Sequence, residues 1–244
     1  MKKFSLAVLA CVAACGAFAQ KFSKTDDDIV HYNWPVSLSI AYPLQIPDCT
    51  YNINGLALDV IYGERHDMNG LDLGLVSLNT GNVKALQIKG LASCTDFSVY
   101  GCQMSGLANV VLGNAYGLQL SSLANYNRGE FAGVQIAAAN CNGALYGFQA
   151  GVFNYNKGAC RALQFGLVNS DVNDYRGWSL GVLNYAVRYR GVQIGAINAI
   201  AETGRAVQIG AINSASNFSG VQFGLFNIIE NGALPIMVVL NASF

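Results

Sequence analysis

The chain has 244 residues, of which 52% are hydrophobic and only 11% are charged, whereas a typical soluble domain carries about 25% charged residues. Basic and acidic residues are equal in number, 14 of each, so no excess of positive charge supports nucleic-acid binding. After the N-terminal segment no run of about 18 apolar residues occurs, which excludes a membrane-spanning helix.

Residues 1–19 are typical of a secretory signal. Two lysines precede an apolar stretch, and Ala17 and Ala19 form a small-x-small cleavage site that would make Gln20 the first mature residue. Residues 12–15, which end at Cys15, have the spacing of a lipoprotein processing site and leave that alternative open. Both interpretations predict export. Residues 20–34 form a polar leader, and residues 35–244 are expected to form a single β domain.

A repeat of about 15 residues fills most of this domain. The sequence Gly-Val-Gln-Ile-Gly-Ala-Ile-Asn at 191–198 recurs almost unchanged at 206–213 and again at 220–227. Looser copies extend the repeat region over residues 55–230. The third position of each copy falls at residues 57, 72, 87, 103, 119, 135, 149, 164, 179, 193, 208 and 222.

Each repeat alternates in hydrophobicity with a period of two, which predicts a β-strand. Val192, Ile194 and Asn198 fall on one side of this alternation, and Gln193 falls on the other. Asn-Gly pairs and related turn signals separate the copies, as tight hairpins require. Two further strands are predicted at 36–46 and 235–244. The total is about fourteen, and an even number is typical of a bacterial membrane barrel.

Two architectures are compatible with short strand repeats, an antiparallel transmembrane β-barrel and a β-solenoid. The barrel is favoured because alternation runs without an obvious corner and the strands are long enough to cross a bilayer. Tyrosines near the strand ends resemble an interfacial girdle; they are Tyr62, Tyr100, Tyr116, Tyr126 and Tyr146. A barrel would expose the Val/Ile row to lipid, whereas a solenoid is expected to bury that row.

Two resemblances support a surface location. The alternating apolar residues that lead to the terminal Phe244 resemble the C-terminal signature of outer-membrane β-barrel proteins. That resemblance implies that Phe244 is an assembly signal for the barrel-insertion machinery. The repeat itself resembles a family of bacterial surface-repeat proteins with Gly-Val-Gln-Ile-Gly-x-x-Asn units. This second resemblance implies the outer membrane or the cell surface and carries no activity.

The Gln/Gly side of the alternation is expected to line the barrel lumen. Three charges interrupt this lining, and Asp59, Asp72 and Lys89 form either a selective constriction or, as favoured here, an internal salt bridge. The remaining candidate lumen-lining residues are all glutamines: Gln87, Gln103, Gln119, Gln135, Gln149, Gln164, Gln193, Gln208 and Gln222. They would give either an uncharged pore or a hydrogen-bonded plug.

No other residues suggest chemistry. His66 beside Asp67 is interpreted as a solvated surface pair rather than an acid–base site. Five cysteines follow the signal, an odd number, and Cys94 and Cys102 flank one turn that a disulfide could bridge. Most are expected to be small apolar side chains within strands. The sequence predicts no catalytic residues, no cofactor and no metal.

These features predict an outer-membrane β-barrel surface protein that acts as a passive channel or a structural scaffold. Its partners would be outer-membrane lipid and the barrel-insertion machinery, without nucleic acid. The alternative is an exported β-solenoid surface protein that binds a partner or carbohydrate. An enzyme is not expected.

Overall fold

The computed structural model describes residues 31–243, and these contain strands and turns but no helix. The predicted signal segment 1–19, most of the leader 20–34 and Phe244 lie outside the described residues. The chain divides into two compact units, which meet in the sequence between Ala137 and Ala138. Each unit is described by itself below.

Unit 1 contains nine strands in the described part of the chain. Their bounds are β1 Asn33–Ala41, β2 Leu44–Ile46, β3 Asn52–Arg65, β4 Met68–Asn79, β5 Val83–Thr95, β6 Val99–Ser105, β7 Ala108–Val111, β8 Ala115–Ser121 and β9 Ala124–Ile136. Unit 2 contains six more within residues 138–243. They are β10 Ala139–Ala150, β11 Phe153–Asn156, β12 Cys160–Ile194, β13 Ile197–Ile209, β14 Ile212–Ile229 and β15 Ile236–Ser243.

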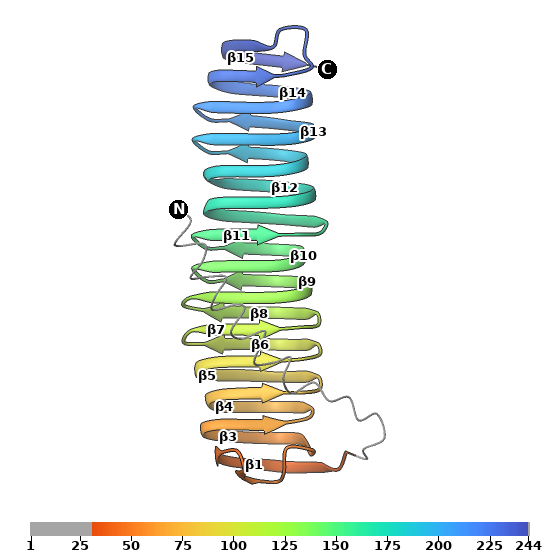
Figure 1. The fold of residues 1–244 in the computed structure, drawn as a ribbon, viewed down its shortest axis with the longest axis vertical. Coiled ribbons are helices and arrows are strands. Elements are labelled where there is room, and N and C mark those ends of the chain that lie inside the picture. The colour runs from red at the N-terminus through yellow and green to blue at the C-terminus, as the bar shows by residue number, and fades with distance from the viewer. Residues whose placement is uncertain (1–30, 244) are drawn as a thin grey trace. The chain divides into compact units, whose positions relative to one another are not determined.

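Within each unit the chain winds into stacked coils, one repeat per coil (Figure 1). Neighbouring coils pair in parallel: Gln87 lies beside Gln103, 16 residues later, and Gln193 lies beside Gln208, 15 residues later. Antiparallel pairing occurs at β1–β2 and β14–β15, the first and last described pairs of the chain. The fold is therefore a β-solenoid. The predicted antiparallel transmembrane barrel is wrong, and the porin-like channel that depended on it is not supported.

The barrel prediction failed because each repeat contains a corner. Residues 192–198 were expected to be one unbroken strand, but β12 ends and β13 begins on either side of Gly195 and Ala196. This corner shifts the alternation by one residue, so Gln193 and Asn198 both point inward and are 1% and 0% exposed. Each repeat therefore supplies two sheet segments. The asparagine that a barrel would place at the lipid interface lies in the interior.

The barrel interpretation placed the Val/Ile row against lipid, and the solenoid interpretation placed it in the interior. The second placement is wrong as well. The expected burial of this row does not occur: Ile209, which follows Gln208, is 43% exposed, whereas Gln208 is fully buried. The reason is the alternation itself, because Gln and its two apolar neighbours must point to opposite faces of the sheet. The interior of the coils is thus lined by amides, and the aliphatic side chains face outward.

An apolar column complements the amides inside each unit. It comes from the residue four places before the Gln position and is buried in every coil. Its members in unit 1 are Ile53, Met68, Val83, Val99, Ala115 and Phe131. In unit 2 the column includes the stacked pair Tyr175 and Tyr189, whose ring centroids are 5.0 Å apart, and Phe218. Removing these side chains from water is the main hydrophobic contribution to the stability of the stack.

The glycine that opens most repeats is required by close stacking. Gly191 has a φ of 140°, which side chains rarely adopt. A Cβ at this position would also overlap the carbonyl oxygen of Gly177 in the preceding coil. The absence of a side chain at Gly191 therefore lets its coil approach the preceding coil to hydrogen-bonding distance.

Candidate functional site

A buried cluster of four charges occupies the interior of unit 1. Lys89 Nζ lies 2.6 Å from Asp59 Oδ2 and 2.5 Å from Asp72 Oδ1. Arg65 Nη1 lies 2.7 Å from Asp72 Oδ1, and Nη2 of the same guanidinium contacts Asp59. All four side chains are essentially inaccessible to water. The three charges singled out in the sequence thus meet in the internal ion pair that was favoured, and Arg65 completes it.

The cluster is electrically balanced, with two cations and two carboxylates. Burial alone would raise the pKa of Asp72, but Arg65 and Lys89 outweigh this effect and hold that pKa below its usual value. The same carboxylates raise the pKa of Arg65. Asp72 and Arg65 therefore remain ionised within the cluster. This arrangement is a structural element of the interior, because all four side chains are closed off from solvent.

The glutamines predicted to line a lumen form hydrogen-bonded ladders inside the coils. In unit 1, Gln103 Nε2 donates to Gln87 Oε1 at 2.7 Å, and the ladder continues through Gln119 to Gln135. In unit 2 one ladder joins Gln164 to Gln149, and a second joins Gln193, Gln208 and Gln222. All nine side chains are buried. Most of their amide groups bond to one another, which offsets the cost of burying them, although Gln164 Oε1 and Gln222 Oε1 find no partner among the described residues.

An asparagine ladder runs parallel to the glutamines in the second sheet of the coils. In unit 2 each side-chain amide donates to the next Oδ1 and to a backbone carbonyl oxygen; Asn198 Nδ2, for example, lies 2.9 Å from Asn213 Oδ1 and 3.0 Å from the Ile209 oxygen. The ladder links Asn140, Asn154, Asn169, Asn184, Asn198, Asn213 and Asn227. It ties the corner of each coil to the coil that follows.

Asn198→Ala is expected to destabilise the protein by roughly 2–4 kcal/mol, because it breaks the ladder bonds to Asn184 and Asn213 in the interior and removes one of the two donors to the Ile209 carbonyl oxygen. Asn217→Ala is the control, because Asn217 is exposed; its side chain donates to the Glu202 carbonyl oxygen and accepts from the exposed Asn231. Its cost should be below about 1 kcal/mol. Urea unfolding of both variants measures the difference, and equal costs would contradict a structural role for the ladder.

His66 and the cysteines do not form a reactive site. The His66 ring is half-buried and stacks on His31 with centroids 3.7 Å apart, and burial, reinforced by His31, lowers the pKa of His66. Its Nε2 is 4.0 Å from Asp67, so the predicted surface pair is a loose one. Cys102 is a free thiol, so the disulfide with Cys94 that the sequence left open is not formed.

The outward side of the glutamine sheet carries apolar side chains. Each coil places one apolar residue before and one after its inward-pointing position, and we call this set the outer apolar face. In unit 2 it consists of Phe148, Ala150, Leu163, Phe165, Trp178, Leu180, Val192, Ile194, Val207, Ile209, Val221 and Phe223. Several of these side chains are more than a third exposed, and Trp178 is 56% exposed.

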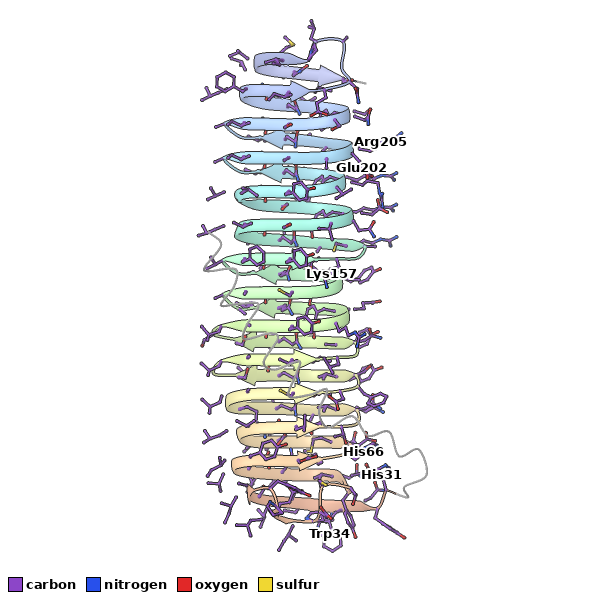
Figure 2. All side chains as sticks on the ribbon, in the orientation of Figure 1. His31, Trp34, His66, Lys157, Glu202 and Arg205 are labelled. Atoms are coloured by element: carbon purple, nitrogen blue, oxygen red, sulfur yellow. The ribbon has the colours of Figure 1, made fainter. Side chains whose placement is uncertain are left out.

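A row of cations borders this face in unit 2 and was not predicted from the sequence. Arg161, Arg176, Arg190 and Arg205 all precede the inward-pointing position of their coil by three residues, so they point outward like the outer apolar face. Reading the repeat column by column, rather than along the chain, would have found them. Figure 2 shows Arg205 projecting from the edge of its coil.

Among residues 31–243 no helix is long and apolar enough to cross a membrane. Within the same residues no group of three or more His, Cys, Asp or Glu side chains is arranged to hold a metal ion. No protein-family model, no curated protein and no solved structure matches this chain.

Proposed function

We propose that the protein is an exported, non-enzymatic β-solenoid that acts at the bacterial surface by docking a partner on its outer apolar face. The observation that carries this proposal is the inverted polarity of the coils. Amides that are usually solvated are buried and paired, while aliphatic and aromatic side chains are exposed in every coil. Contiguous apolar surface of this kind marks an interaction site in proteins that fold in water.

Export and surface location are supported by the sequence of residues 1–19, which has the features of a secretory signal. The resemblance of the repeat to bacterial surface-repeat proteins agrees with that location. A partner is favoured over carbohydrate because the outer apolar face carries few hydrogen-bonding groups, which sugar hydroxyls require. The polar side chains that a sugar site would use are turned inward and bonded to one another.

The proposal is tested by making the face polar without changing the strand. A variant with Val192, Ile194, Val207 and Ile209 all replaced by Thr keeps β-branched side chains and should keep its circular dichroism spectrum. Its stability should stay within about 1 kcal/mol of the wild type, because these side chains point outward. It should, however, bind an apolar fluorescent dye much more weakly and show less self-association by light scattering.

A matched control lies in the same strand. Ile200 is 2% exposed, in contrast to the 43% of Ile209, so Ile200→Thr should cost about 1–2 kcal/mol by burying a hydroxyl while leaving dye binding unchanged. If the four-Thr variant and the wild type bind the dye equally, the outer apolar face is not a docking surface.

A further inference from the structure

The arginine row of unit 2 is continuous with the outer apolar face. Arg190 lies in register with Arg205, and Arg161 with Tyr146. The coils that carry Arg161, Arg176 and Arg190 stack directly, because the backbones at Ala162, Gly177 and Gly191 are in contact. Neighbouring strands are about 4.8 Å apart, so the four guanidinium groups form one line along the edge of the face.

Within unit 2, Asp174 is the acidic group affected by this line: Arg188 and, to a lesser extent, Arg176 and Arg190 lower its pKa. The exposed ion pairs there are made by Arg188, which bonds Asp174 at 2.6 Å and Glu202 at 3.1 Å. Glu230 accepts a hydrogen bond from Ser216. Among the described residues no ion pair involves Arg161, Arg176, Arg190 or Arg205. Counting the outward groups of residues 138–243 gives six cations against three carboxylates.

Four like charges on adjacent strands repel one another and lower the stability of the stack. Such a row is therefore expected where an anionic ligand compensates for it. Arginine also suits a boundary between apolar and charged surroundings, because its methylene stem lies along apolar surface while the guanidinium reaches polar groups. Trp178, which stands on the face beside Arg176, has the amphipathic ring that favours a membrane–water interface.

We infer that the outer apolar face of unit 2 and its arginine row bind the surface of an anionic lipid bilayer. The apolar side chains would enter the interface, and the arginines would pair with lipid phosphate groups. This inference rests on the proposed function, since it names the partner that covers the same face. No strand crosses the bilayer in this arrangement; the sheet lies on the surface.

Charge and polarity together favour lipid over the other occupants. A soluble polyanion would neutralise the arginines but leave the aliphatic rows exposed to water. A second copy of unit 2 offers no free acidic row, because Asp174 and Glu202 are already bound by Arg188. A lipid surface supplies both an apolar layer and a dense array of phosphates.

The experiment is flotation of the purified full chain with two kinds of vesicle, phosphatidylcholine alone and phosphatidylcholine mixed with phosphatidylglycerol. The wild type should bind the mixed vesicles more tightly. Arg176→Gln combined with Arg190→Gln should weaken this binding on the order of tenfold or more. Arg128→Gln combined with Lys157→Gln removes the same charge from exposed positions outside the row, and should change binding less than about threefold. Trp178→Ser should weaken binding to both kinds of vesicle.

Several outcomes would overturn the lipid assignment. Equal binding to both vesicles that does not depend on Arg176 and Arg190 would remove the role of the arginine row. Binding of soluble dextran sulfate without binding of vesicles would assign the row to a polyanion. Failure to bind vesicles while the four-Thr variant still loses dye binding would leave the docking function intact with another partner. Failure of both tests would reject the docking function as well.

Discussion

Lys89→Met is expected to destabilise the protein by about 3–5 kcal/mol, the typical cost of removing one partner from a buried ion cluster. The Lys89 ammonium bonds both Asp59 and Asp72, at 2.6 and 2.5 Å. Without it, Arg65 alone faces two carboxylates in the interior of unit 1, and one negative charge is left without compensation. The loss is measured by urea unfolding followed by circular dichroism.

A double substitution separates charge from packing. Asp72→Gln with Lys89→Ser removes one charge of each sign. The new residues are those found at the same two repeat positions, Gln103 and Ser105, in the coil after Lys89. The Asp59–Arg65 contact remains, so the double variant should lose much less stability than the sum of its two single variants. Arg188→Gln is the exposed comparison and should cost far less than Lys89→Met. A cost for Lys89→Met as small as that would show that the four buried charges do not stabilise one another.

Much of the local structure was predictable from the sequence because the repeat is strong. The period of about 15 residues, the β conformation and the inward direction of the glutamines all follow from the alternation around each Gln. The meeting of Asp59, Asp72 and Lys89 follows from the same columns. Each of these properties belongs to one position of the repeat, so it holds in any arrangement that stacks the repeats.

The choice between barrel and solenoid was not predictable in this way. It depends on the corner at Gly195 and Ala196, which reads as a continuation of the strand because both residues are small and uncharged. Once that corner exists, Asn198 turns inward and its ladder requires parallel neighbours, since Asn198 must meet Asn213 at the same height. Arg65 was missed for a related reason. It lies outside the eight-residue unit that recurs along the chain, and it reaches Asp59 only because the chain turns into a coil.

Asp171→Asn is expected to stabilise the protein at pH 8 by roughly 2–3 kcal/mol. Asp171 is fully buried in unit 2, where burial raises its pKa to about 7 against hydrogen bonds from Asn156, Gln164 and Cys160 that lower it. An unfolded aspartate has a pKa of about 3.9. The folded state therefore holds a proton that the unfolded state releases between about pH 4 and pH 7. Stability falls as the pH rises through that range and stays low above it.

The asparagine removes this dependence, because an amide carries no charge at any of these pH values. The difference of about 3 between the two pKa values corresponds to about 4 kcal/mol, from which the unpaired Nδ2 of the new amide subtracts part. An amide fits the column, because Asn127, Asn142 and Asn156 occupy it in other coils. Below about pH 4 the variant should bring no gain.

Asp174→Asn, three residues away, is expected to change the stability at pH 8 in the opposite direction. Asp174 is exposed, and its hydrogen bond from Arg188 lowers the pKa of that carboxyl. Its contribution is present above pH 4 and lost as the pH falls, so the asparagine should reduce stability at pH 8, by less than about 1 kcal/mol. Urea unfolding of the wild type and both variants between pH 4 and pH 8 measures the two slopes. A wild type whose stability does not change across this range would show that Asp171 is ionised in the folded protein, with a counter-charge that its present neighbours do not supply.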